Sequence, residues 1–230
     1  DCHVNVITLP ASLDERYFEP LVRSLEAAQQ ERVLFDATHV RWADPYGMVG
    51  MLALGEVARR RGEQPILKMP DSAEVVSYMT RMGFFEHAAP IFELHGARPR
   101  ARQDGASEVL LEITPINSHA DVHAIVDLVN ERGMTILTRL LHYPLREAFQ
   151  FSVILSEVCQ NIIEHAEAGG WVGIQTYNWA KRLGRQVVVI GVADLGVGFR
   201  GSLAKEHAAR FVDRWGDLTA LQAAFLHGVT

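Results

Sequence analysis

The pattern that most constrains the fold of this chain is a run of polar side chains spaced four residues apart. Glu157, Asn161 and His165 fall within an arc of roughly 80° if residues 152–166 form a helix, because successive helical residues turn by about 100°. The opposite side of that helix is apolar. One face therefore packs, while the other directs a carboxylate, an amide and an imidazole towards one place.

A second short pattern follows this helix. The apolar segment Gln186–Ala193 predicts a strand, and it leads into Asp194-Leu-Gly196-Val-Gly198. A carboxylate at this point can accept a hydrogen bond from an exocyclic amine such as that of adenine. The glycines have no Cβ, so the backbone can approach a ligand closely. The strand end thus carries groups that suit an amine-bearing ligand.

In this order, with the strand-like segment Trp171–Asn178 between them, the two patterns resemble the N and G1 boxes of the GHKL ATPase superfamily. The spelling E-x-x-x-N-x-x-x-H is similar to that of its anti-sigma-factor serine kinases. The resemblance covers roughly Glu108 to Thr230 and implies a Bergerat-type α/β sandwich that binds ATP and Mg²⁺. It implies that Glu157 is a catalytic base and that Asn161 holds the metal.

The resemblance also implies the contacts of the nucleotide itself. His165 would contact the phosphates and Asp194 the adenine, with Gly196 and Gly198 beside the adenine. The family's next elements are a lid and a second glycine-rich box, whereas this sequence ends at Thr230 before such a box. The segment Gly196–Gly201 also spells G-x-G-x-x-G, but a dinucleotide fold requires a further helix and parallel strand after it.

The N-terminal segments alternate between strand-like and helix-like patterns. The apolar run Arg32–Phe35 predicts a strand, and the spacing of apolar residues in Tyr17–Gln30 predicts a helix. A further helix is bounded by Pro45 at its first turn and by Gly62 after its last. The β-α-β-α-β-α order predicts a small α/β domain.

The loop before this last helix resembles the signature of STAS domains, the anti-sigma-factor antagonist fold. In that family a strand is followed by Asp-Ser-Ser-Gly and a helix, and a partner kinase phosphorylates the second serine. Here Asp44-Pro45-Tyr46-Gly47 keeps the acid and the glycine but has Pro and Tyr at the serine positions. We therefore expect residues 1–95 to escape serine phosphorylation and to form a constitutive docking or dimerisation surface centred on the helix start, Asp44–Gly50.

Two α/β domains follow from these patterns. Gly96–Ser107 combines glycine, proline and charge without apolar periodicity, which is typical of a linker. We expect a STAS-like domain over residues 1–95, a linker over 96–107 and a GHKL-type sandwich over 108–230. Within the last, two neighbouring strands should form a hairpin, and Leu218–Leu226 is predicted to be helical.

Composition narrows the class of partner. The net charge of −6 and the absence of a basic patch argue against direct binding of nucleic acid. The chain lacks an apolar run of 18 residues, so no membrane span is expected, and no signal peptide is recognisable. Two cysteines cannot build a disulfide framework or a Cys-type zinc site. A cytoplasmic location is therefore expected.

The resemblance leads to two hypotheses about function. In the first, the protein is an ATP-binding regulator of partner-switching type, and if active it is a Mg-ATP-dependent serine kinase or ATPase. In the second, it is a non-catalytic module that signals by docking. Its partner would be a regulatory protein such as a sigma factor, an anti-sigma antagonist or another STAS protein, and a homodimer is compatible with both hypotheses.

Overall fold

A computed structural model of the chain describes residues 3–28, 31–96, 109–140, 144–165, 169–178, 186–194 and 219–226. The first half contains β1 (Val4–Thr8), β2 (Ser12–Leu13), α1 (Glu19–Ala27), β3 (Arg32–Asp36), β4 (Trp42–Ala43), α2 (Pro45–Arg61), β5 (Ile66–Lys68), α3 (Ala73–Arg81), α4 (Phe84–Ala88) and β6 (Glu93–His95). The second half contains β7 (Val109–Ile116), α5 (His119–Thr135), α6 (Leu145–His165), β8 (Gly170–Asn178), β9 (Gln186–Asp194) and β10 (Thr219–Leu226). The protein is thus a mixed α/β structure.

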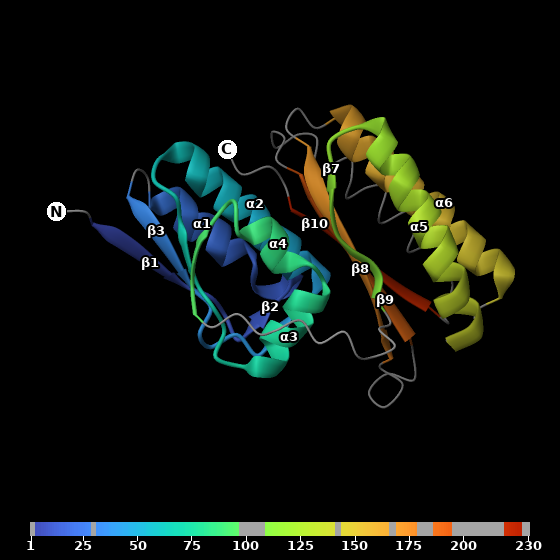
Figure 1. Ribbon diagram of the computed structural model, residues 1–230, viewed down its shortest axis with the longest axis horizontal. Helices are drawn as coiled ribbons and strands as arrows, with labels where there is room; N and C mark the ends of the chain where they lie inside the picture. The colour runs from blue at the N-terminus through green and yellow to red at the C-terminus, as the bar shows by residue number, and fades with distance from the viewer. Residues whose placement is uncertain are drawn as a thin grey trace.

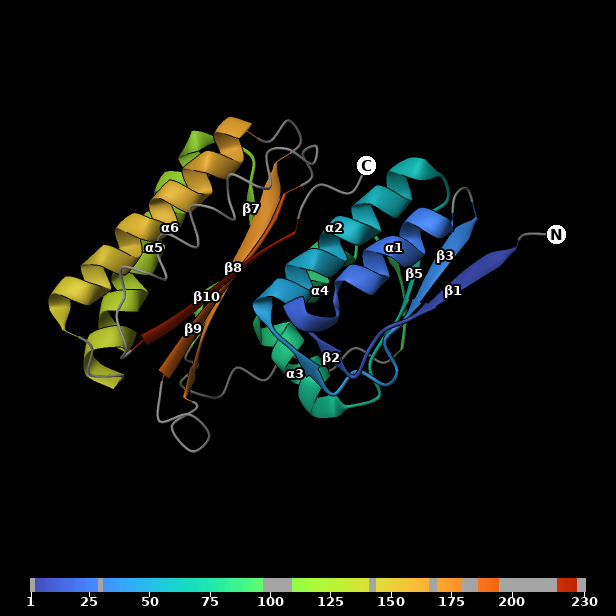
Figure 2. The same cartoon turned by 180° about the vertical axis from the view of Figure 1, so that it is seen from behind.

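The first half is built on a parallel sheet with the strand order β1-β3-β5-β6. Its helices α1 to α4 lie on one face of this sheet, as the two opposite views in Figures 1 and 2 show. Side chains that alternate along the strands, among them Ile7, Val33 and Phe35, are buried against those helices. The opposite face carries exposed residues such as Val6.

Helix α2 is the central element of the molecule. It begins where the Asp44 carboxylate accepts a hydrogen bond from the Gly47 N–H (2.9 Å), and Pro45 occupies the first helical position. Every residue from Pro45 to Ala58 is buried. A helix that is buried all round needs apolar neighbours on both sides. The second half of the chain supplies the neighbours that the first sheet does not.

The second half is built on a sheet with the order β10-β9-β8-β7. Strands β8 and β9 form the expected antiparallel hairpin, and β7 pairs antiparallel with β8. The helix predicted for Leu218–Leu226 is wrong, because Thr219–Leu226 is strand β10, paired in parallel with β9 along its whole length. Pairing with a neighbouring strand here overrides the helical spacing of the segment.

The two faces of this second sheet are covered by different parts of the chain. Helices α5 and α6 cover one face, and α2 of the first half contacts β8 and β9 on the other. Ala193 of β9 belongs to the same hydrophobic core as α2 and the first sheet. The layers therefore run sheet, helices, sheet, helices, and the inner helical layer serves both sheets (Figure 2).

Two further expectations from the sequence concern the linker and the absence of membrane spans. Of the predicted linker 96–107, only Gly96 lies within the described residues. In the part of the chain that the structure describes, no helix has the length and apolar character needed to cross a membrane.

Candidate functional site

Helix α6 carries the predicted catalytic and metal-binding positions. Ala148 and Ser152 are buried on one side of this helix, while the Glu157 side chain is exposed to solvent on the other. This agrees with the sequence-based assignment of one packing face and one polar face. Asn161 and His165 follow at four-residue intervals in the same helix, which ends at His165; the described structure includes their backbone positions but not their side chains.

Strand β9 ends at Asp194, the predicted adenine contact. In the antiparallel register of the hairpin, Asp194 is the partner of Gly170, the first residue of β8. Gly170 follows His165, the end of α6, after four intervening residues. The carboxyl end of β9 and the C-terminal end of α6 therefore lie at the same end of this layer. At most about 18 Å of chain joins His165 to the position paired with Asp194.

The ligand contacts themselves fall outside what the structure describes. Gly196 and Gly198 lie outside the described residues, as does the Asp194 side chain. Among the residues that are described, no group of three or more His, Cys, Asp or Glu side chains could hold a metal ion. Asn161 stays the predicted Mg²⁺ ligand of the family resemblance, with the remaining ligands expected from triphosphate oxygens and water.

The start of α2 is a second candidate site, because the loop that resembles the STAS signature lies there. The Asp44 side chain caps the helix, and its backbone N–H donates to the Leu13 carbonyl at 3.2 Å. The Tyr46 ring meets Phe18 edge to face, with 5.5 Å between the ring centroids. Tyr46 is only 5% exposed. A kinase acting from solvent could not reach its hydroxyl in this fold.

Burial changes the acid–base properties of this loop. It raises the pKa of Asp44 from 3.8 to about 7, and the nearby charges of Asp14 and Glu15 act in the same direction. The hydrogen bond from Gly47 opposes the rise but does not cancel it. Burial likewise raises the pKa of the Tyr46 phenol. Asp44 therefore titrates near neutrality in the folded chain.

The α2 start is covered by the chain's own second sheet. A Cβ placed on Gly191 of β9 would lie 2.4 Å from the Pro45 carbonyl carbon and 2.4 Å from the Tyr46 nitrogen. Only a residue without a side chain permits this approach. On the adjoining strand, Gly173 likewise faces Pro45. The expected docking surface at Asp44–Gly50 is thus buried within the molecule rather than offered to another protein.

Sequence reasoning missed this contact although a signal for it was present. Glycine weakens a strand interior, so a glycine there often marks the close approach of another backbone. Gly173 and Gly191 are partners in the β8–β9 register. Such a pair of glycines in a hairpin indicates a place where something packs directly on the backbone.

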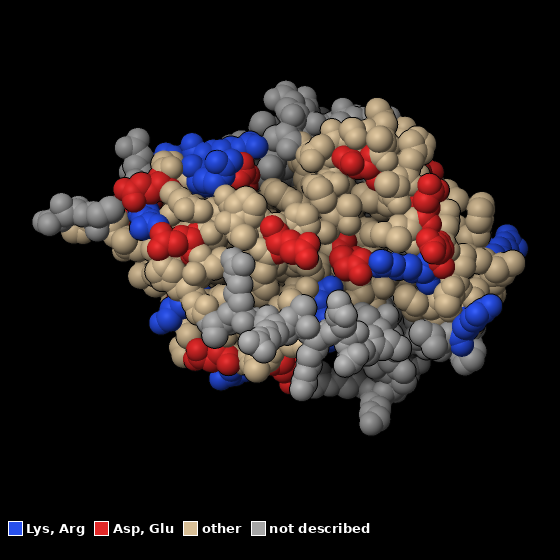
Figure 3. Space-filling view, in the orientation of Figure 1, with Lys and Arg blue, Asp and Glu red and all other residues tan. Residues whose placement is uncertain are grey.

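Charged side chains gather elsewhere on the surface. Arg59, Arg60 and Arg61 form the last turn of α2, and Figure 3 shows basic side chains at that end of the molecule. Glu56 accepts hydrogen bonds from Arg59 (2.7 and 2.8 Å) and from Arg60 (3.0 Å). The bonds from Arg59 lower the pKa of Glu56. Arg59 and Arg60 are therefore already paired with Glu56 at the end of the helix.

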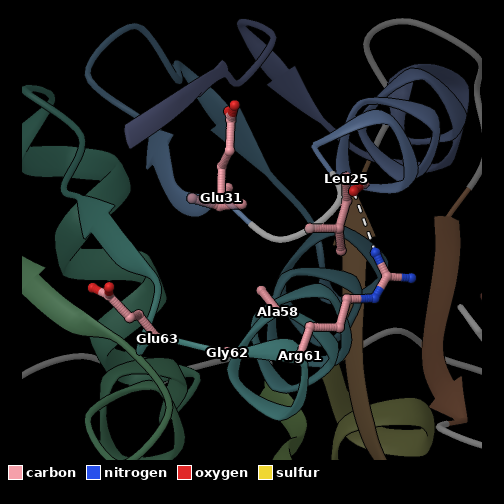
Figure 4. A pocket seen from close by; sticks show the side chains of 7 residues that line it. Leu25, Glu31, Ala58, Arg61, Gly62 and Glu63 are labelled. Atoms are coloured by element: carbon pink, nitrogen blue, oxygen red, sulfur yellow. Dashed lines mark hydrogen bonds between the residues drawn. The ribbon is translucent and has the colours of Figure 1, made fainter. Parts of the chain in front are cut away.

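A small pocket lies beside this basic end. Its lining is Leu25, Glu31, Val33, Ala58, Arg61, Gly62 and Glu63. Arg61 donates from Nη1 to the Leu25 carbonyl at 3.3 Å, while the Glu31 and Glu63 side chains point away from it (Figure 4). The pocket contains none of the residues predicted from the sequence to bind nucleotide, and it lies on the first half rather than near α6.

No family model, no curated protein and no solved structure matches this chain. The functional assignment therefore rests on its own residues.

Proposed function

We propose that this protein is a nucleotide-dependent regulatory switch of partner-switching type, with a GHKL-type ATP-binding half and a STAS-like half. The observation that carries the proposal is the register of the β8–β9 hairpin. It brings Asp194 level with Gly170, and thereby to the end of the layer at which α6 finishes. The C-terminal end of α6 and the carboxyl end of β9 thus lie at one end of this layer, which supports the proposal of a single nucleotide site.

Within this proposal each position has a distinct role. Asp194 accepts from the adenine amine beside Gly196 and Gly198. Asn161 holds Mg²⁺ on the triphosphate, and His165 lies near the phosphates. Glu157 takes the proton from a partner's serine hydroxyl or from water. Its exposure on α6 supports this role, because a general base must reach the proton that it removes.

The STAS-like half has an unusual place in the proposal. Its α2 start, the surface expected to dock on a partner, is buried against β8 and β9 of the same chain. We infer that this half acts as a permanently docked companion of the ATP-binding half. A further regulatory protein, such as a sigma factor or an antagonist, would have to bind at another surface.

Nucleotide titration by calorimetry, with and without Mg²⁺, is the decisive experiment. ATP and ADP should bind more tightly than GTP, because the six-position oxygen of guanine cannot donate to Asp194. An unmatched buried acceptor costs about 1–3 kcal/mol, or roughly 5- to 150-fold in affinity. Asp194→Asn should remove this preference. Equal affinity of the wild-type protein for ATP and GTP would exclude the adenine contact.

Metal binding and catalysis are tested by two further substitutions with matched controls. Asn161→Ala should weaken Mg²⁺-dependent ATP binding, whereas Asn130→Ala on α5 should not. Glu157→Gln should bind ATP normally and lose turnover, because a base acts in the chemical step, whereas Glu147→Gln on the same helix should retain it. A chain that binds no nucleotide would instead support the non-catalytic docking module.

A further inference from the structure

The two edges of the first sheet are built differently. The β6 edge is short and charged, with Glu93 bonded to Arg32 and to His95. Charged side chains on an edge strand discourage pairing with another chain. The β1 edge, Val4–Thr8, has the sequence VNVIT, with no charge and no proline. It is a strand of high β-propensity that lacks the usual protection of an edge.

The backbone groups available on this edge follow from one hydrogen bond. The Leu9 N–H donates to the Asp36 carbonyl of β3 at 2.9 Å. Successive residues of a strand direct their backbone groups to opposite sides, so the odd-numbered residues of β1 face β3. Val4, Val6 and Thr8 therefore direct their N–H and C=O groups away from the sheet, towards the open edge.

The side chains of these residues are also uncovered. Ile7 points into the core between the sheet and the helices, and alternation places Val4 and Val6 on the other face. No helix of the described part of the chain lies on that face (Figures 1 and 2), and Val4 is 41% and Val6 57% exposed. All-parallel sheets are ordinarily covered on both faces. Two exposed valines thus lie on the same strand as the open edge.

We propose that β1 pairs antiparallel with β1 of a second copy of this chain, around a two-fold axis at Val6. The two Val6 residues would exchange two hydrogen bonds. On either side, Val4 of one copy and Thr8 of the other would exchange two more. The two four-stranded sheets would then continue as one sheet of eight strands. The same pairing brings the exposed valines side by side on the uncovered face, where cross-strand β-branched pairs are favourable.

The size of this interface indicates a weak, reversible dimer. Six hydrogen bonds, at about one per 100–200 Å² of interface, correspond to about 600–1,200 Å² of buried surface. That is at the lower end for a specific contact. The strand itself carries no charge, so the two copies meet without like-charge repulsion along the paired segment.

Sedimentation velocity of the full chain tests the proposal between about 1 and about 200 μM, where an interface of this size dissociates. Wild-type protein should shift from monomer to dimer across this range. Val6→Pro removes the outward N–H but leaves the bonds between β1 and β3. Losing both central bonds should raise the dimer Kd about 30-fold. Val6→Lys, which places two like charges across the axis, should also weaken the dimer.

Val153→Lys is the matched control, because Val153 on α6 is 43% exposed and far from β1; it should leave the dimer unchanged. Hydrogen exchange gives an independent readout, with the Val6 amide protected at high concentration only. A wild-type chain that stays monomeric throughout the range overturns the proposal. A dimer that survives Val6→Lys also overturns the proposal. A Val6 amide that is protected in the monomer does so too, because another segment would then cover this edge.

Discussion

Replacement of the buried Asp44 by asparagine is the sharpest test of the structure, because the substitution keeps the helix cap and removes only the charge. Asparagine caps a helix about as well as aspartate does, so the bond from Gly47 is retained. Burial raises the pKa of Asp44 from 3.8 to about 7. Folding therefore makes the chain bind a proton that the unfolded chain releases between about pH 4 and about pH 7.

The pKa shift of Asp44 determines the sign and size of the change in the free energy of unfolding. The unfolded state binds fewer protons in that window, so the free energy of unfolding falls as pH rises through it. A shift of about 3 pH units at about 1.4 kcal/mol each amounts to about 4 kcal/mol. At pH 8 the Asp44→Asn chain should be more stable than wild type by up to about 4 kcal/mol. At pH 4 the two should agree within about 1 kcal/mol, because both side chains are then neutral in the folded state.

Urea unfolding at pH 4, 5, 6, 7 and 8, followed by tryptophan fluorescence and circular dichroism, measures this difference. Coincident transitions by the two probes establish that the free energies can be compared. Asp36→Asn is the control. Hydrogen bonds from Thr38 lower the pKa of Asp36, so its contribution is lost only in acid and the difference from wild type should be flat above pH 5. A difference between Asp44→Asn and wild type that does not change with pH would refute the reasoning.

Two further predictions concern the contact between the halves. Gly191→Ala forces a Cβ to within 2.4 Å of the Pro45 backbone, so it should destabilise the protein by about 1–3 kcal/mol or more in urea unfolding; Gly62→Ala, whose Cβ meets nothing within 4 Å, should not. Incubation with Mg-ATP followed by mass spectrometry should find no phosphate on serine or on Tyr46 in residues 1–95. Phosphate on Tyr46 would contradict the burial of the helix start, and stoichiometric phosphate on any serine would contradict the expectation that this half escapes serine phosphorylation.

Local signals in the sequence predicted the first half well. The bounds expected for α2 are those observed, because Pro45 and Gly62 are start and stop signals that act within a turn. The segment 218–226 was misassigned as a helix for the opposite reason. Its structure depends on pairing with β9, a strand some 30 residues away, and local spacing contains no information about that partner.

The candidate site likewise has a part that local sequence signals predict and a part that depends on long-range pairing. The four-residue spacing of Glu157, Asn161 and His165 was sufficient to place them on a helix, and they lie on α6. The placement of Asp194 at the end of the sheet where α6 finishes depends on the β8–β9 register, which the sequence predicted only as a hairpin. The close approach of Gly191 to the Pro45 backbone could not be predicted at all, because the two residues are about 150 positions apart in sequence. The nucleotide contacts themselves stay predictions.

The position of α2 between two sheets has a consequence for the synthesis of the protein. When the first half has left the ribosome, the side of α2 that belongs against β9 is still without its cover. Nearly 100 more residues must be made before Gly191 arrives, which takes roughly 5–20 s at ordinary rates of translation. During that interval an apolar helix start is open to misassembly. Growth at low temperature, or co-expression of chaperones, should therefore change the yield of folded protein. This change should be larger than expected from the solubility of the finished chain.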